Sequence, residues 1–240
     1  RKLKAFFVYP LMERFIIDRH TAQLAVLQRT ELISPPLRNL RKVLGRYIFS
    51  QFVSKYLINT SEISNKYFLL MENEYLNIKK YLAKNQTILS IGSGIGGLEL
   101  LIAKNLKSHI SLIEKNYISK KIRYGWDIKN NEGYNKLKLQ YNFFKSNGVS
   151  EEFFKAYDFD TDNFPEKKFD IIISLYSLDY HYNFDIYKDY LKKILQPNTI
   201  MIFDTIRSEY FKKLFKNIDI IKEENNTVHK SKRIACWDLI

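Results

Sequence analysis

Residues 87–97 read Thr-Ile-Leu-Ser-Ile-Gly-Ser-Gly-Ile-Gly-Gly and decide the fold expected for this 240-residue chain. The run Ile88–Ile91 has the apolar pattern of a buried strand, and the apolar run Leu98–Leu106 is long enough for a helix. The glycines at positions 92, 94, 96 and 97 let a ligand approach the backbone closely, and the following helix turns its amino terminus toward negative charge. The stretch therefore predicts a nucleotide-type cofactor site between a strand and a helix.

A second predicted strand, His109–Glu114, ends in an acidic residue about 20 residues after the glycine loop. A carboxylate at this point can accept hydrogen bonds from the hydroxyl groups of a ribose. The spacing Gly92-x-Gly94-x-x-Gly97 also matches the fingerprint of dinucleotide-binding proteins. The glycine loop and Glu114 are therefore compatible with two cofactors, a nicotinamide dinucleotide and S-adenosylmethionine.

Strand-like and helix-like runs continue to alternate toward the carboxyl terminus, which predicts a parallel sheet with right-handed crossovers. The further strands are expected at Phe154–Tyr157, Phe169–Leu175 and Thr199–Asp204. Helices are expected near Tyr134–Ser146, Phe184–Leu195 and Glu209–Phe215. The last two runs, Ile218–Lys222 and Arg233–Leu239, are separated by a polar turn and predict a hairpin. A dinucleotide enzyme needs a second mononucleotide-binding half, for which too few strands remain.

Four segments of residues 85–240 resemble class I S-adenosylmethionine-dependent methyltransferases. They are Leu89–Gly96, Leu112–Glu114, Asp160–Pro165 and Lys168–Ser174. The resemblance implies an α/β fold with a Rossmann-like, seven-stranded methyltransferase sheet whose last strand is antiparallel, and S-adenosylmethionine as the cofactor. One departure is Ser90, two residues before the first glycine, where the family has an acidic residue and a contact to the methionine end of the cofactor.

The same resemblance assigns residues to the parts of the cofactor. Gly92, Ser93, Gly94 and Gly96 would bind it through the glycine loop, the first three against the methionine moiety, and Glu114 would bind the ribose. Phe159 and Asp160 would flank the adenine, while Ser174 and Leu175 would line the cleft. The alternative for Asp160 is a turn residue beside Asp162-Asn163.

Residues 174–182, after the fourth strand, hold the densest polar and aromatic cluster of the chain. They follow the carboxyl end of a strand, where ligands bind in such folds. Methyl transfer to an alcohol requires a general base, because a hydroxyl is a poor nucleophile until its proton is removed. His181, with an unperturbed pKa of about 6.5, is the expected base, and Asp179 is expected to orient it or to act itself. A structural, hydrogen-bonded histidine is the alternative.

A narrower resemblance is to sugar O-methyltransferases of bacterial surface-polysaccharide loci. It rests on the short motifs Tyr124-Gly125-Trp126, Tyr134-Asn135-x-Leu137-x-Leu139, Ser146-Asn147-Gly148-Val149 and His181-Tyr182. It implies that a saccharide acceptor is bound by Trp126, Tyr134, Asn135 and Tyr182. Aromatic rings suit the apolar face of a sugar, and an amide bonds its hydroxyl groups. The alternative for Trp126 and Tyr134 is ordinary core packing.

Residues 1–84 are expected to form a helical N-terminal segment that serves as a lid, a dimer surface or a partner surface for a methyltransferase domain over residues 85–240. Three helices are expected, at about Leu11–Arg29, Leu37–Phe52 and Ser61–Leu82. Residues 1–60 carry a net charge of +8 out of the total of +13, which favours an anionic partner. The alternatives to a small acceptor are therefore an RNA or other nucleic-acid methyltransferase and a methyltransferase-like subunit without catalysis.

Cysteine content and hydropathy set the expected compartment. The single cysteine, Cys236, excludes an internal disulfide and a cysteine-rich zinc site, favours a reducing compartment, and gives no reason to expect a metal. Glu13, Arg14 and Asp18 interrupt the apolar stretch Ala5–Ile17, so no transmembrane segment is expected. The expected location is the cytoplasm, although a sequence that begins at Arg1 leaves an upstream targeting signal open.

Overall fold

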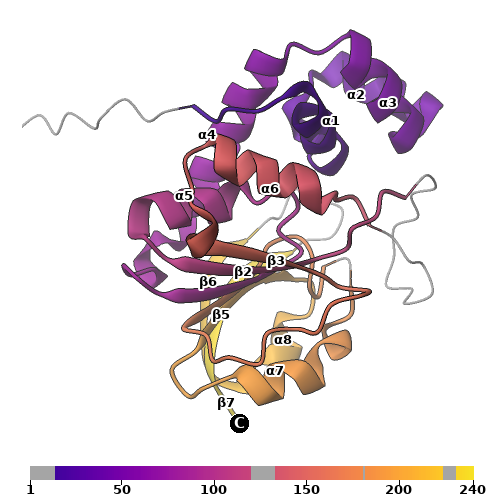
Figure 1. Ribbon diagram of the computed structural model, residues 1–240. Helices are drawn as coiled ribbons and strands as arrows, with labels where there is room; N and C mark the ends of the chain where they lie inside the picture. The colour runs from indigo at the N-terminus through magenta and orange to yellow at the C-terminus, as the bar shows by residue number, and fades with distance from the viewer. Residues whose placement is uncertain (1–13, 120–132, 181, 224–230) are drawn as a thin grey trace, which may run out of the picture.

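The described residues form one seven-stranded sheet with helices on both faces (Figure 1). The computed structural model describes residues 14–119, 133–180, 182–223 and 231–240. The strands are β1 Thr87–Ile91, β2 His109–Glu114, β3 Phe154–Asp158, β4 Ile171–Ser174, β5 Ile200–Thr205, β6 Phe215–Glu223 and β7 Lys232–Leu239. Their order is β3-β2-β1-β4-β5-β7-β6. Strands β1 to β5 run parallel, whereas β7 is antiparallel to both β5 and β6, which confirms the predicted methyltransferase-type sheet.

Strands β1 and β4 lie at the centre of the sheet, where the chain reverses its direction of winding. From β1 the chain builds outward through β2 and β3, and it then returns to place β4 on the other side of β1. Ile91 is in register with Ile113 of β2, and Ser90 with Ile173 of β4, so three carboxyl ends meet at one edge. Ligands bind at such a reversal in open α/β sheets. The topology therefore directs a site to the loops after β1, β2 and β4.

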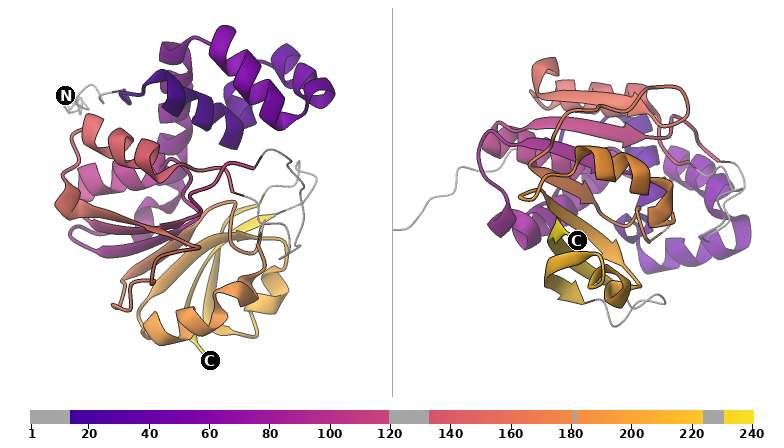
Figure 2. Two further views of the ribbon diagram at one scale, coloured as in Figure 1. Left: turned by 45° about the vertical axis from the view of Figure 1, so that its right-hand side comes forward. Right: turned by 90° about the horizontal axis from the view of Figure 1, so that it is seen from below.

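Alternate residues of the central strands enter two different cores, because successive side chains of a strand point to opposite faces. Ile88 and Ile171 pack with α4, α5 and α6, whereas Leu89 and Ile172 pack with α7 and α8. Figures 1 and 2 show these two groups of helices on opposite sides of the sheet. The helices are α4 Thr60–Ile78, α5 Gly97–Leu106, α6 Leu137–Ser146, α7 Lys188–Ile194 and α8 Ser208–Phe211. Burial on both faces explains the nearly unbroken apolar strands in the sequence.

Four α-helices precede the sheet in the described residues, where the sequence predicted three. They are α1 Arg19–Gln28, α2 Pro35–Leu44, α3 Arg46–Tyr56 and α4, with 3₁₀ turns at Thr30–Leu32 and Lys79–Tyr81. Gly45, at a φ of 76°, divides the predicted helix Leu37–Phe52 into α2 and α3. Helix α1 begins at Arg19 because the Asp18 carboxylate accepts a 2.6 Å hydrogen bond from the Thr21 amide and caps the helix.

Two other predicted boundaries near the carboxyl terminus are wrong. The helix expected over Glu209–Phe215 ends at Phe211, because Phe215 already begins β6. The helix expected over Phe184–Leu195 is a 3₁₀ turn at Phe184–Ile186 followed by α7.

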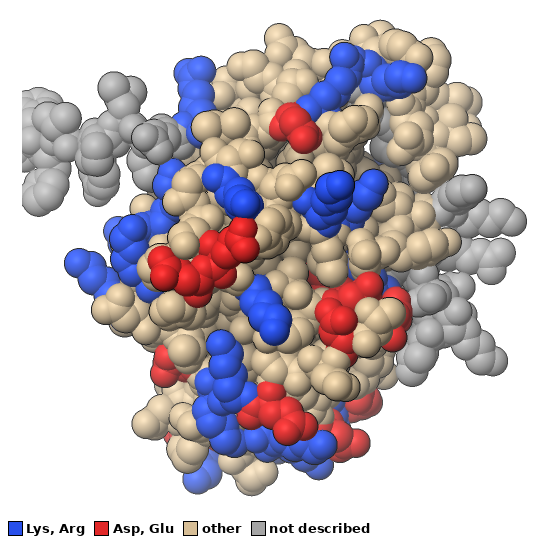
Figure 3. Space-filling model, in the orientation of Figure 1, with Lys and Arg blue, Asp and Glu red and all other residues tan. Residues whose placement is uncertain are grey.

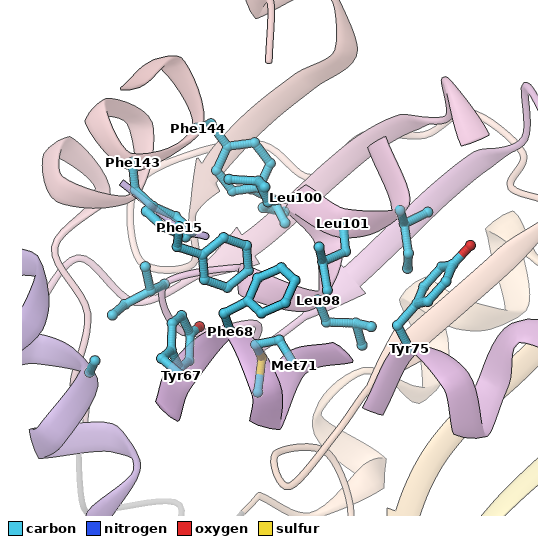
Figure 4. Close-up of a cluster of buried hydrophobic side chains, with 14 of the residues drawn as sticks. Phe15, Tyr67, Phe68, Met71, Tyr75, Leu98, Leu100, Leu101, Phe143 and Phe144 are labelled. Atoms are coloured by element: carbon cyan, nitrogen blue, oxygen red, sulfur yellow. The ribbon is translucent and has the colours of Figure 1, made fainter. Parts of the chain in front are cut away.

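The N-terminal helices share one apolar core with α5 and α6 (Figure 4). Phe15, which precedes α1, lies with its ring centroid 5.2 Å from those of Phe68 in α4 and Phe143 in α6. Leu98 of α5 belongs to the same cluster. Full burial of a side chain of this kind contributes about 1.5–3 kcal/mol. The segment ahead of residue 85 is therefore packed directly over the helix that follows the glycine loop.

Charged side chains are spread over the face of the molecule seen in Figure 3, where Lys and Arg occur from the top to the bottom with Asp and Glu between them. No helix in the described parts of the chain is long and apolar enough to span a bilayer.

Candidate active site

A cavity of about 200 Å³ lies at the carboxyl ends of β1, β2 and β4. Nine of the residues predicted from the sequence line it: Gly92, Ser93, Gly94, Glu114, Tyr134, Asn135, Phe159, Leu175 and Tyr182. The predicted residues Gly96, Asp160, Ser174 and Asp179 are described but do not line it. Trp126 and His181 lie outside the described residues. Lining residues that the sequence did not predict include Gln28, Arg29, Glu74, Glu99, Tyr176 and Ser177.

The glycine loop has a backbone that requires glycine at two positions beside the cavity. Gly92 and Gly94 have φ values of 72° and 64°, in the left-handed region that other residues adopt at a cost. A side chain at Gly92 would also overlap that of Ser177 in the loop after β4. The two loops are therefore in close contact across the central strands.

Glu114, at the end of β2, is buried against the glycine loop. Its Oε1 accepts hydrogen bonds from the Gly94 amide and, at 3.1 Å, from Ser93 Oγ. Burial raises the pKa of this carboxyl group to about 8, although both hydrogen bonds act in the opposite direction. Glu114 thus holds the glycine loop through the same carboxyl group that the family resemblance assigns to the ribose.

Three side-chain amides from outside the motif also hold the glycine loop. Asn135 Nδ2 and Gln140 Nε2 donate to the Gly94 carbonyl oxygen at 2.9 and 2.6 Å. Gln28 Oε1, at the end of α1, accepts from the Ile95 amide at 3.1 Å. The Asn135 amide, which the sequence assigned to an acceptor, therefore contacts the cofactor loop. Neither glutamine was predicted, because each comes from a helix distant in sequence.

Phe159 provides an apolar wall on the side of β3. Its ring packs against Tyr187 at a centroid distance of 5.6 Å, and Lys115 Nζ lies 4.8 Å from its centre. Lys115 also forms a 3.0 Å ion pair with Asp160, which is partly exposed beside the cavity. Phe159 is thus placed to cover a flat ring, whereas Asp160 is held by Lys115.

Ser174 and Leu175 end β4 and have different environments. Ser174 is buried, and its Oγ donates to the Ile91 carbonyl at 2.7 Å and accepts from the Leu178 amide at 2.9 Å. It therefore joins β1 to the loop after β4, while Leu175 lines the cavity.

The loop after β4 is anchored through Asp179, which is fully buried and has a φ of 59°. Its carboxylate accepts a hydrogen bond of 2.5 Å from Oγ1 of Thr205, the last residue of β5, and forms an ion pair with Arg207, two residues later. Its backbone amide donates to the Tyr182 carbonyl at 2.7 Å. The Asp179 carboxylate is thus occupied by the protein itself.

A buried charge network lies under Tyr176. The guanidinium carbon atoms of Arg29 and Arg233 lie 4.5 and 5.3 Å from the centre of its ring. Arg233 is buried and pairs with Glu74 of α4 and, at 3.0 Å, with Asp204 of β5. The network joins the N-terminal helices to the carboxyl edge of the sheet. This network could not be predicted from the sequence, since Glu74 and Arg233 are 159 positions apart.

The lining suits S-adenosylmethionine by its chemistry. Glu114 offers a carboxylate for ribose hydroxyls, Phe159 and Leu175 offer apolar surface, and the backbone of Gly92 is open to a ligand. Glu99 adds a second carboxyl group beside the glycine loop, which a cationic group of the cofactor can bind. The sheet order, the glycine loop and this cavity define a class I S-adenosylmethionine-dependent methyltransferase.

The family is given by comparison with known proteins. A family model described as a methyltransferase domain matches residues 65–234, which is most of the chain. The chain therefore belongs to this methyltransferase family, and S-adenosylmethionine is its cofactor. No curated protein matches the sequence.

Solved structures with a similar fold are distant. A ribosomal protein L11 methylase from Lactobacillus delbrueckii subsp. bulgaricus is 14% identical over 72% of this chain and 79% of its own, with a TM-score of 0.47. A methyltransferase from Geobacter sulfurreducens, in complex with S-adenosyl-L-homocysteine, is 12% identical over 56% and 46%, with a TM-score of 0.38. The protein YjhP from Escherichia coli is 16% identical over 55% and 47%, with a TM-score of 0.39. The aligned region spans about half of the last two chains.

Proposed function

We propose that this protein transfers the methyl group of S-adenosylmethionine to a hydroxyl group of a sugar or of another small polar acceptor. The observation that supports this proposal is the aromatic wall of the cavity, to which Tyr134, Tyr176 and Tyr182 all contribute. Tyrosine rings pack on the apolar face of a sugar, and their hydroxyl groups bond its polar edge. A cavity of about 200 Å³ favours a small acceptor.

In this proposal His181 is the general base. The cofactor supplies an electrophilic methyl group, and the acceptor oxygen forms a bond to its carbon as the carbon–sulfur bond breaks. The acceptor proton passes to the imidazole of His181, which follows Tyr180 and precedes Tyr182 in the sequence. Asp179, which was the other candidate, is better suited to anchor the loop after β4, because Thr205 and Arg207 already occupy its carboxylate.

The acceptor is tested by methyl transfer from labelled S-adenosylmethionine to a panel of free sugars, nucleotide sugars and RNA. We expect labelled saccharide and no labelled RNA. An RNA product would overturn the proposal in favour of a nucleic-acid methyltransferase. That second candidate is supported by residues 32–61, which carry five basic residues and no acidic one.

The base is tested by His181→Ala and His181→Gln in the same assay. General-base catalysis contributes typically about 10²–10⁴-fold, so both variants should lose turnover on this scale while S-adenosylmethionine affinity is unchanged. Full turnover in His181→Ala would exclude His181 as the base.

A further inference from the structure

Glu99 is a buried carboxylate at the cavity that the proposed reaction does not use. It lies in the first turn of α5, directly after the glycine loop, with only 3% of its surface exposed. Its Oε1 accepts a 2.6 Å hydrogen bond from Ser90 Oγ of β1. Ser90 stands at the position where the family has an acidic residue. A serine and a carboxylate are therefore in direct contact at this end of β1, with the carboxylate on the helix instead of the strand.

The carboxylate of Glu99 has no cation bonded to it within the described residues. No Lys, Arg or His nitrogen described by the structure lies within 4.0 Å of it, and Arg29 acts on it only at longer range. Burial raises the pKa of Glu99 to about 7. A buried carboxyl group of this kind is destabilised when charged, unless a cationic partner is bound.

A cationic ligand is therefore the partner that this position lacks. Glu99 lines the same cavity as Gly92 and Ser93, which the family resemblance places against the methionine moiety. That moiety carries an ammonium group, a donor of three hydrogen bonds with a full positive charge. We propose that Glu99 binds the ammonium group of the methionine moiety of S-adenosylmethionine, and that Ser90 orients its carboxylate.

The inference depends on the cofactor and not on the identity of the acceptor. Three ligands separate the contributions of its parts. S-adenosylmethionine carries the ammonium group and a sulfonium charge, S-adenosylhomocysteine carries the ammonium group alone, and 5′-methylthioadenosine has neither the amino acid moiety nor the charge. If Glu99 contacts the ammonium group, its loss must weaken the binding of S-adenosylmethionine and S-adenosylhomocysteine equally and leave the binding of 5′-methylthioadenosine unchanged.

The experiment is calorimetric titration of wild type and Glu99→Gln with these three ligands. A hydrogen bond to a charged group is worth about 1.5–3 kcal/mol, so we expect about 10- to 100-fold weaker binding of the first two ligands. Binding of 5′-methylthioadenosine should stay within about twofold. Glu62→Gln is the control, because Glu62 also occupies the first turn of a helix, α4, but is exposed to solvent. All three ligands should bind Glu62→Gln with the affinity of wild type.

A charge swap gives a second, independent result. Glu99→Ser should weaken S-adenosylmethionine binding. The double variant Ser90→Asp/Glu99→Ser returns the carboxylate to the strand and should bind S-adenosylmethionine at least tenfold more tightly than Glu99→Ser does. Circular dichroism melting shows which variants are folded. If Glu99→Gln does not fold, Ser90→Ala replaces it, and about three- to tenfold weaker binding of the two amino acid ligands is expected.

Three results would overturn the proposal. Unchanged affinity in folded Glu99→Gln would exclude the contact, an equal loss for all three ligands would show that Glu99 only shapes the site, and a loss confined to S-adenosylmethionine would assign it to the sulfonium. A swap variant no better than Glu99→Ser would also contradict it. Absence of S-adenosylmethionine binding by wild type is a different outcome, since it would contradict the cofactor itself.

Discussion

The loops after β1 and after β4 face each other across the cavity but are held by different partners. Residues 92–96 are fixed by hydrogen bonds to Glu114 and to the side-chain amides of Gln28, Asn135 and Gln140. Residues 175–180 are fixed by hydrogen bonds from Leu178 to Ser174 and from Thr205 to Asp179, and by the ion pair of Asp179 with Arg207. The first loop is held by side chains from β2, α1 and residues 135–140, whereas the second depends on the end of β5. We therefore expect that cofactor binding and catalysis can be impaired separately.

The largest effect is expected where the two loops touch. Gly92→Ala places a methyl group against Ser177 and in a left-handed backbone conformation, so both loops must move. Left-handed strain of about 1–2 kcal/mol and overpacking of about 1–3 kcal/mol should together lower the free energy of unfolding by about 2–5 kcal/mol. Urea denaturation measures this change, and S-adenosylmethionine affinity should fall about 100-fold or more.

The matched control for Gly92→Ala is the double variant Gly92→Ala/Ser177→Gly. It removes the overlap but not the backbone strain, so it should recover the overpacking part of the lost stability. No recovery would mean that the loops are not in contact as described.

The next effect separates the loops. Asp179→Asn keeps the hydrogen bond from Thr205 but removes the charge that pairs with Arg207, whose side chain is 38% exposed. We expect a loss of about 1–3 kcal/mol in stability, because the pair is only half buried. Turnover should fall about 30-fold, since each tenfold corresponds to about 1.4 kcal/mol. Cofactor affinity should remain within about twofold.

Steady-state kinetics and calorimetry on the same preparation check this expectation. Glu209→Gln, which removes only the exposed pair with Lys212, should leave both quantities unchanged. Equal losses of turnover and cofactor affinity in Asp179→Asn would show that the two loops act as one unit.

A pH titration probes the first loop alone. Burial raises the pKa of Glu99 to about 7 and that of Glu114 to about 8, so both are largely protonated in the free protein at pH 6. Arg29 lowers the pKa of Glu99, and the charge of Glu99 raises the pKa of Glu114. The ammonium and hydroxyl groups of the cofactor bind the ionised forms, so affinity should rise as pH rises. Between pH 6 and 7.5 the ionised fraction increases about 8-fold for Glu99 and about 24-fold for Glu114, so affinity should rise by about tenfold if Glu99 alone counts and by up to about 200-fold if both do.

Calorimetry in two buffers of different ionisation enthalpy should show proton release on binding in this range. Glu99→Gln should reduce the pH dependence and the number of protons released. Affinity that falls as pH rises would contradict the assignment of both carboxylates.

The smallest effect is expected at the contact from the N-terminal helices. Gln28→Ala removes the acceptor of the Ile95 amide, a hydrogen bond of about 0.5–1.5 kcal/mol. S-adenosylmethionine should bind about 3- to 10-fold more weakly, whereas Gln51→Ala on the exposed side of α3 should have no effect. Equal affinities of Gln28→Ala and wild type would remove α1 from the cofactor site.

The sheet could be predicted from the sequence because each buried strand is a short apolar run and the glycine loop fixes where the first one ends. The helix boundaries were less accessible, since Gly45 lies within a continuous apolar periodicity and breaks it only through its backbone conformation. Glu114 was found because its distance from the glycine loop is set by one strand–helix–strand unit.

The rest of the site depends on contacts between residues far apart in the chain. Gln28 reaches the glycine loop from 67 positions away, and the partner of Asp179 is Arg207, 28 positions later. Glu99 was hidden for another reason, since a glutamate in the first turn of a helix is ordinary in sequence. Only its burial against Ser90 reveals a role. Ser90 itself was noticed as a departure, and the structure shows which carboxylate lies beside it.

One measurement tests the separation of the two loops most directly, namely the dissociation constant of S-adenosylmethionine for wild type, Gly92→Ala and Asp179→Asn measured side by side. We expect binding by wild type, retained affinity in Asp179→Asn and an affinity about 100-fold lower in Gly92→Ala. Equal affinities in all three proteins, or no binding by wild type, would contradict it.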